Sequence, residues 1–195
     1  MSKNRLEAFS DGVIAIIITV MVLELKIPHG AGLDDLVPMI PVLFSYILSF
    51  VYIAIYWNNH HHMFQTVHKI SGSVLWANMH LLFWLSLMPF TTAWAGENYF
   101  APVPVAVYGF VLMMSGIAYY ILARFLVRAE PEAPIAKALG KDFKGKVSVV
   151  MYAIAIPLAW LHPALALLIY VAVAAIWFVP DRRMERVLKG QGSAK

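Results

Sequence analysis

Long, nearly unbroken runs of apolar residues dominate the chain, and short polar or proline-containing segments separate them. A helix needs about 20 mostly apolar residues to cross the hydrocarbon core of a bilayer. The runs do not alternate between apolar and polar positions, which favours helices over the strands of a membrane β-barrel. The sequence therefore predicts an all-α integral membrane protein with six transmembrane helices. Their predicted ranges are 9–27, 38–57, 74–95, 102–125, 147–161 and 164–179.

The composition supports this class of protein. Of the 195 residues, 61% are hydrophobic and 13% are charged, whereas soluble domains carry about 25% charged residues. The mean hydropathy is +0.72. There are no cysteines, so we expect neither a disulfide framework nor a thiolate metal site. The first apolar run is too long for a cleavable signal peptide.

The basic residues predict an orientation. If both termini are cytoplasmic, fourteen of the fifteen lysines and arginines lie on the cytoplasmic side and only Lys26 lies outside. Such an asymmetry supports an even number of spans and cytoplasmic termini. Topology and contact with anionic lipid explain the net charge of +4, so we expect no nucleic-acid partner. We interpret residues 1–195 as a single six-span domain.

The first span, in the stretch RLEAFSDGVIAIIITVMVLEL, has a distinctive surface. On a helical wheel with Ile16 at zero, Val20 lies near 40°, Leu23 near −20° and Thr19 near −60°, at about 100° per residue. One face thus presents large apolar side chains and one hydroxyl. Asp11 lies at about −140° on the same wheel, and we expect it to face neighbouring helices.

The polar start of this span suggests a second role. An ionisable residue close to the membrane is costly unless it is paired or hydrated. We therefore interpret Arg5, Ser10 and Asp11 as a hydrogen-bonding clamp that fixes the rotation of the helix, with donors such as Trp57 and Asn58 at the same level. The alternative is an ordinary interfacial helix end, with Asp11 near the helix N-terminus.

The pattern Arg-x-x-x-Phe-Ser-Asp, present as Arg5, Phe9, Ser10 and Asp11, resembles the signature of the transmembrane protein 175 family of potassium channels. The stretches GVIAIIITVMVLEL, YWNNHHHMF and LSLMPFTTAW strengthen the resemblance, which covers essentially the whole chain. It implies a potassium-preferring cation channel, not an enzyme, without a selectivity-filter loop and without a cofactor. For a chain with one six-span repeat it also implies a homotetramer in a bacterial cell membrane, with the first helix around a central pore.

The resemblance also implies site residues. The family's pore-lining apolar positions fall on Ile16, Val20 and Leu23, and Thr19 lies where some bacterial members place a ring of hydroxyls. Ions would then pass a hydrophobic constriction and be discriminated by their dehydration cost. Periodicity alone does not assign the stripe to a pore, because an apolar stripe is more often a helix-packing face. Glu24, at the outer end of the span, is a candidate for attracting cations to an outer mouth.

The sequence also bears on functions other than a channel. A small secondary transporter is the main alternative, but transporters usually place ionisable residues or broken helices near the midplane, and the mid-span positions here are almost wholly apolar. No spacing of carboxylates, histidines or nucleophiles indicates a catalytic centre. His60, His61 and His62 cannot all face one metal ion, because consecutive helical side chains point about 100° apart. They suit hydrogen bonds between helices, a proton-responsive role or a polar membrane boundary, and residues 130–146 suit a surface segment or short interfacial helix.

Overall fold

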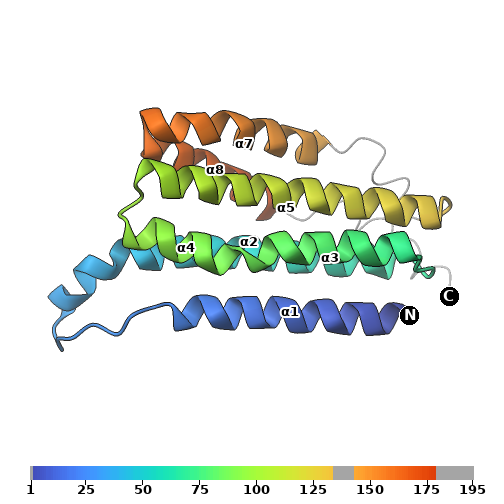
Figure 1. Ribbon diagram of the computed structural model, residues 1–195, viewed down its shortest axis with the longest axis horizontal. Coiled ribbons are helices and arrows are strands. Elements are labelled where there is room, and N and C mark those ends of the chain that lie inside the picture. The colour runs from blue at the N-terminus through green and yellow to red at the C-terminus, as the bar shows by residue number, and fades with distance from the viewer. Residues whose placement is uncertain (1, 134–142, 179–195) are drawn as a thin grey trace.

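The computed structural model describes residues 2–133 and 143–178, and every regular element in these ranges is helical (Figure 1). The predicted all-α class is therefore confirmed. Of the predicted surface segment 130–146, residues 134–142 lie outside the described residues. The elements are α1 (Lys3–Leu23), the 3-10 helix η1 (Leu33–Met39), α2 (Ile40–Gln65), α3 (Gly72–Ser86), α4 (Met88–Glu97), α5 (Pro102–Ala129), α7 (Phe143–Leu161) and α8 (Pro163–Phe178).

The helices make six passes along the bundle in the described part of the chain, because α3 and α4 form one interrupted pass (Figure 1). Five of the passes are long and apolar enough to cross a membrane: α1, η1 with α2, α3 with α4, α5, and α7. The sixth, α8, is apolar but has only 16 residues. Length and composition thus support five of the six predicted spans, and α8 lies where the sixth was predicted.

Several predicted span boundaries need correction. The first helix ends at Leu23 rather than at residue 27, and α2 continues to Gln65, eight residues beyond the predicted end at residue 57. The three consecutive histidines therefore lie within α2, beyond the predicted end of the span. Polar residues can extend a membrane helix beyond the apolar run that hydropathy detects, because helical hydrogen bonding does not depend on side-chain polarity.

The interruption between α3 and α4 has a local cause. Pro89 has no backbone N–H, and its ring clashes with the carbonyl four residues earlier in a regular helix. The helix breaks at Leu87, whose backbone N–H donates back to the carbonyl of Trp84 and to that of Leu85, which Pro89 deprives of a donor. The regular bonds resume with the Thr91 N–H, which donates to the Leu87 carbonyl at 3.1 Å. A broken helix is tolerated within a membrane when its freed backbone groups find such partners.

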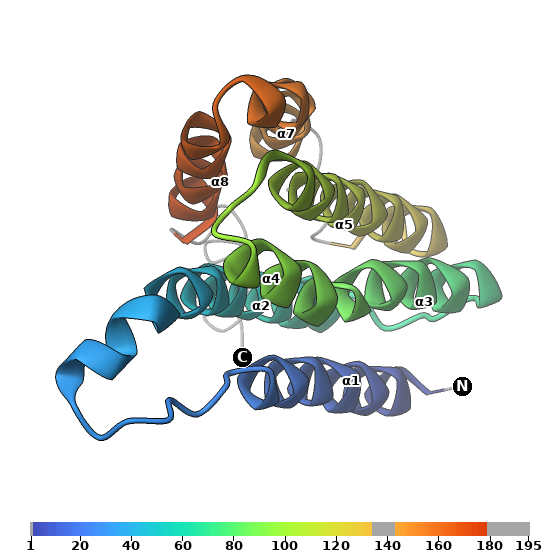
Figure 2. The same ribbon diagram turned by 60° about the vertical axis from the view of Figure 1, so that its left-hand side comes forward.

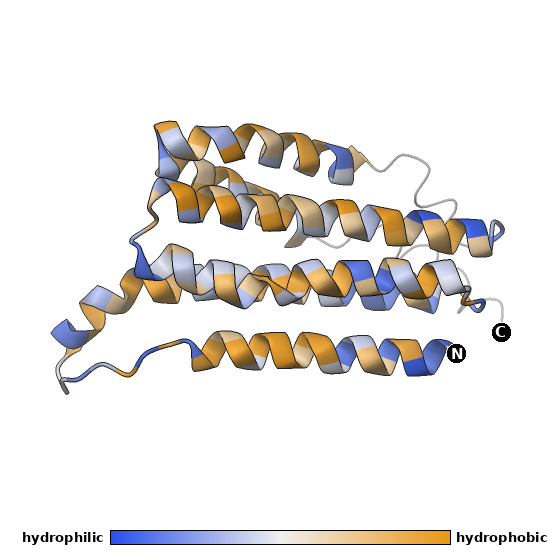
Figure 3. Ribbon diagram, viewed as in Figure 1, coloured by the Kyte–Doolittle hydropathy of each residue, from blue (hydrophilic) through white to orange (hydrophobic). Residues whose placement is uncertain are grey.

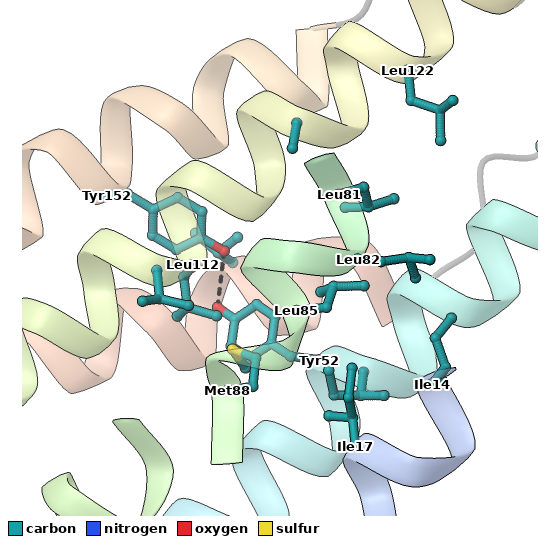
Figure 4. Packing of buried hydrophobic residues seen from close by; sticks show 14 of the residues in the cluster. Ile14, Ile17, Tyr52, Leu81, Leu82, Leu85, Met88, Leu112, Leu122 and Tyr152 are labelled. Atoms are coloured by element: carbon teal, nitrogen blue, oxygen red, sulfur yellow. Dashed lines mark hydrogen bonds between the residues drawn. The ribbon is translucent and has the colours of Figure 1, made fainter. Parts of the chain in front are cut away.

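The helices form layers, with α1 on one side of the molecule (Figure 2). Helix α1 packs against α2, α3 and α4, whereas α5, α7 and α8 lie on the opposite side of those helices. Ile14 and Ile17 of α1 are buried with Leu85 of α3, and Leu112 and Tyr152 are buried in the layer beyond (Figure 4). Only one side of α1 is therefore covered by its own chain.

Hydrophilic residues are frequent at the end of the bundle where α1 begins (Figure 3). That end also holds the loop between α2 and α3, which Glu130 fixes by accepting hydrogen bonds from the backbone N–H groups of His68 (2.7 Å) and Lys69 (3.3 Å). These two bonds, the one from His68 above all, lower the pKa of the Glu130 carboxyl. Lys26, which was predicted to be the only basic residue on the other side, lies at the opposite end, where its ammonium contacts the Glu97 carboxylate at 2.6 Å.

Gly96 allows α4 to lie unusually close to α2. A Cβ atom at this position would lie 2.6 Å from Ser45 Oγ and 2.7 Å from the backbone Cα of Val42. The backbone atom cannot move aside as a flexible side chain would. The contact between these two helices therefore requires glycine.

We expect Gly96→Ala to lower the free energy of unfolding by about 1–3 kcal/mol, because it forces two packed backbones apart. Thermal unfolding of the purified protein in detergent measures this loss. Gly72→Ala is the matched control, since a Cβ there has no heavy atom within 4 Å. Equal stability of the two variants would contradict the close-packing interpretation.

Candidate functional site

The predicted stripe on α1 lies on the side of the helix that its own chain leaves uncovered. Ile16 is 62% exposed, Leu23 is 76% exposed and Val20 is 38% exposed, whereas Ile17 and Met21 on the opposite face are almost completely buried. The described chain thus leaves the apolar stripe largely uncovered. Lipid, a partner helix or a pore are the environments that such a face can meet.

Thr19 adds the one hydroxyl of the stripe. It is exposed, and its Oγ1 donates a hydrogen bond to the Ala15 carbonyl at 2.9 Å. Because the hydroxyl proton is used within the helix, the oxygen lone pairs are left to point outward as acceptors. A group of this kind attracts cations rather than anions.

A buried polar network fixes the other face of α1. Ser10 of α1, His60 of α2 and Asn78 of α3 are each buried. The Asn78 amide Nδ2 donates to Ser10 Oγ at 2.9 Å, and Asn78 Oδ1 accepts from His60 Nε2 at 2.8 Å. Three helices are therefore joined by hydrogen bonds in an apolar environment, where an unpaired polar group is expensive.

A second bond lies beside this network at the level of the next residue. The Trp57 indole Nε1 donates to Asp11 Oδ1 at 3.0 Å, which is the type of donor that the sequence predicted for Asp11. The two other residues of the motif lie outside the network: Arg5 and Phe9 are exposed, and Arg5 makes no hydrogen bond or ion pair with the described residues. Two of the three predicted clamp residues, Ser10 and Asp11, thus bind neighbouring helices.

The histidines take separate roles, as their spacing predicted. His60 joins the buried network, whereas His61 is exposed, stacks on Trp57 and hydrogen-bonds Gln65. His80 accepts a hydrogen bond from its own helix. No group of three metal-ligating side chains is found within residues 2–133 and 143–178.

A cleft of about 660 Å³ runs between α1 and the α3–α4 pass and is open to the surface. It brings together three of the predicted site residues, Ile16, Val20 and Glu24. Glu97 lies in the same cleft, where the ion pair with Lys26 partly neutralises it and raises the pKa of the Lys26 ammonium. Glu24 has no such partner among the described residues. The carboxylates of Glu24 and Glu97 therefore lie in one cleft at the C-terminal end of α1.

Asn78 is the site residue that the sequence analysis missed. The signal was present: Asn78 is a lone amide within the apolar stretch VLWANMHLL. Polar side chains inside membrane helices commonly hydrogen-bond across helices. Pairing it with Ser10, however, requires the tertiary fold, since the two residues are 68 positions apart.

Comparison with known proteins agrees with this arrangement. A family model described as the endosomal/lysosomal potassium channel TMEM175 matches residues 5–89, which contain the clamp and the stripe. A potassium channel of Chryseobacterium sp. is 53% identical over 190 residues, covering 97% of this chain and 99% of that protein. The chain belongs to the TMEM175 family.

Further TMEM175 relatives extend the likeness. A potassium channel of Streptomyces collinus is 33% identical over 150 residues, covering 70% of this chain and 73% of that protein. The fold matches the crystal structure of a lysosomal potassium-selective channel TMEM175 homolog from Chamaesiphon minutus, with a TM-score of 0.79 and 26% identity. That match covers 90% of this chain and 95% of the other. The chain is therefore an integral membrane protein with the TMEM175 fold.

The network makes a testable prediction. Asn78→Leu leaves the buried His60 ring nitrogen without its acceptor, so we expect the free energy of unfolding to fall by about 1–3 kcal/mol. Thermal unfolding of the single variant, of Ser10→Ala and of the double variant measures the coupling. The double variant should lose less stability than the sum of the two single variants.

Asn98→Leu is the control for the loss of an amide, because Asn98 is exposed and bonds only its own helix at Trp94. Strictly additive losses at Ser10 and Asn78 would show that the network does not act as a unit.

Proposed function

We propose that this protein is a potassium-preferring channel of the bacterial cell membrane, formed by four copies of the chain with α1 of each copy lining a central pore. One observation carries the proposal: the apolar stripe of α1 is uncovered, while buried hydrogen bonds on the opposite side fix the rotation of that helix. Membership of the TMEM175 family, in which bacterial relatives are named potassium channels, supports the ion and the class of function.

Fourfold symmetry about an axis beside this face gives rings of identical side chains. Ile16, Val20 and Leu23 form three apolar rings, and Ile16 and Leu23 are separated by roughly 10 Å at about 1.5 Å of rise per residue. Apolar rings cannot replace the water around an ion. They gate by dewetting when narrow and conduct only ions that keep most of their water when wider.

Selectivity in this pore follows from the cost of removing water. Potassium is larger than sodium and holds its water less tightly, so compressing its hydration shell at an apolar ring costs less. Four Thr19 hydroxyls provide one ring of oxygen acceptors beside the constriction, which partly compensates for lost water. Neither element requires a loop of backbone carbonyls, so the proposed channel has no filter loop and no bound cofactor.

The clamp determines which residues reach the axis. A rotation of α1 by one residue, about 100°, would replace the apolar stripe with a different face. The bonds from Ser10 to Asn78 and from Asp11 to Trp57 oppose that rotation. We assign Ser10 and Asp11 to positioning the pore helix and not to contact with the ion.

The orientation and the outer mouth complete the proposal. With both termini cytoplasmic, the basic end of the bundle faces the cytoplasm, in accord with the positive-inside asymmetry. Glu24 then lies at the outer mouth, where four carboxylates concentrate cations. A secondary transporter is the less favoured function, because residues 12–18 in the middle of α1 carry no ionisable side chain.

We expect Ile16→Asn to reduce the preference for potassium over sodium severalfold, because a polar ring hydrates the constriction and lowers the cost of passing a hydrated sodium ion. Reversal potentials of the reconstituted channel under bi-ionic conditions measure the permeability ratio. Current carried by the wild type in resolvable single-channel steps would also exclude a transporter, which turns over too slowly to give them.

Val22→Asn is the matched control for this substitution. Val22 is also an apolar and exposed residue of α1, at 44% exposure, but it lies about 120° from Ile16 on the helical wheel. It should leave the permeability ratio unchanged. An unchanged ratio in Ile16→Asn, or the same change in both variants, would contradict the pore assignment.

A further inference from the structure

A small cavity lies inside the bundle, away from α1 and toward the end where α1 begins. Helices α2, α5, α7 and α8 enclose it, and its volume is about 40 Å³. None of its lining residues is charged, but several carry hydroxyl or amide groups. The polar lining residues include Tyr52, Tyr56, Asn59, Ser148 and Tyr152.

Some hydroxyl groups of this lining already have a hydrogen-bond partner, but their oxygen atoms can accept a further hydrogen bond. Tyr152 donates to the Tyr52 hydroxyl at 3.1 Å (Figure 4), and Tyr52 donates to the Tyr170 carbonyl at 2.6 Å. Ser148 donates to the Lys144 carbonyl and accepts from Trp177. Each hydroxyl oxygen has two lone pairs, so the Tyr152 oxygen can still accept.

Two other polar groups of the lining can form hydrogen bonds that the described chain does not supply. Asn59 donates through Nδ2 to the Ile55 carbonyl at 2.8 Å, but its Oδ1 accepts from no described group. The Tyr56 hydroxyl makes no hydrogen bond with any residue in the described ranges, although its ring packs against Tyr119. A phenol hydroxyl without a partner in an apolar bundle costs free energy.

The space around the Tyr56 hydroxyl results from a glycine. A Cβ atom at Gly116 of α5 would lie 3.7 Å from Tyr56 Oη, and it would meet no other heavy atom within 4 Å. Because Gly116 has no side chain, the hydroxyl faces open cavity and not a packed methyl group. A polar group, the Tyr56 hydroxyl, therefore borders the open part of the cavity.

We propose that this cavity is a binding site for a cluster of about three water molecules, each needing roughly 10–15 Å³ of such volume. Tyr56 Oη donates to the cluster, and Asn59 Oδ1 and the Tyr152 oxygen accept from it. These supply the two to four polar partners that a buried water requires. Drug-sized organic ligands need about 300 Å³ or more, so the volume excludes them.

The water cluster would make the contacts of α2 at the cavity different from those farther along the same helix. Farther along α2, Ser49 pairs directly with Thr92 at 2.6 Å and with Tyr108 at 2.9 Å, so that hydroxyl cluster is complete without water. At the cavity, Tyr152 of α7 bonds Tyr52 of α2 directly, and water adds a second bridge through Tyr56 and Asn59 of α2. Water-mediated contacts are nearly as favourable as direct ones but tolerate small changes in geometry. This inference is independent of the proposed pore.

X-ray radiolysis of the intact protein in detergent, followed by mass spectrometry, tests the proposal. Radiolysis makes hydroxyl radicals from water in place, so a buried ring is oxidised quickly only when water is bound beside it. We expect Tyr152 to be oxidised several-fold faster than Tyr108, which is equally buried but has only a side-chain partner. Tyr56 is partly exposed, so its rate is compared with its rate in the glycine variants. Equal slow rates at Tyr152 and Tyr108 would show a dry cavity and overturn the proposal.

Two glycine variants sharpen the same measurement. Gly116→Ala places a methyl group beside Tyr56 Oη at an ordinary contact distance, so it should fold and should lower the oxidation rate of Tyr56 several-fold. Gly72→Ala, which fills no internal space, should leave that rate unchanged. Fast oxidation of Tyr56 that persists in Gly116→Ala, or fast oxidation of Tyr108 as well, would also overturn the proposal.

Discussion

The hydrogen bonds that join α1 to α2 and α3 are the constraint on which the proposed site depends. Ser10 and Asn78 are buried, and the bond between them, like the bond from Trp57 to Asp11, forms only in the observed rotation of α1, while His60 holds Asn78 in place. Apolar contacts alone would not fix that rotation, because isoleucine and valine occupy most faces of this helix and can exchange places at little cost. A buried polar group cannot move to an unpaired position without losing its partner. The polar side of α1 therefore determines which apolar side is left uncovered.

The same physical rule recurs elsewhere in the bundle. Pro89 removes a backbone hydrogen bond to the Leu85 carbonyl, and the Leu87 backbone N–H donates to that carbonyl at the break. Ser49 of α2 pairs directly with hydroxyls of α4 and α5, and in our proposal other polar groups of α2 and α7 pair with water. Each polar group inside the helical layers is thus either paired or adjacent to a small cavity. In the described part of the chain, every side-chain nitrogen or oxygen with essentially no accessible surface has a partner, so the unpaired Tyr56 hydroxyl borders accessible space.

Much of this arrangement could be predicted from the sequence, because membrane helices are long and their stripes are periodic. The six apolar runs indicated the six passes, and the wheel indicated which face of α1 would differ from the rest. The sequence predicted that the Asp11 carboxylate would accept a hydrogen bond from a neighbouring helix, and the Trp57 indole donates one. Span ends were less predictable: α2 continues to Gln65 through polar residues that hydropathy does not count.

Other features required the tertiary structure or the relatives. Nothing local pairs Ser10 with Asn78, and nothing local shows that Gly96 meets the backbone of α2 while Gly72 meets nothing. The role of the uncovered stripe is a different case. Lipid, a partner helix and a pore all accept isoleucine and leucine, so neither periodicity nor exposure distinguishes them, and the assignment to a pore came from resemblance to a family.

Cysteine accessibility tests the central claim most directly, because the chain contains no native cysteine. Single cysteines at Ile16, Thr19, Val20 or Leu23 would be exposed to silver ions, which are similar in size to permeant cations, while current through the reconstituted protein is recorded. The account predicts irreversible block at these positions and no block at Val22→Cys. Block at position 22 with none at positions 16 and 23 would place the stripe against lipid or a partner, and would contradict a pore lined by this face of α1.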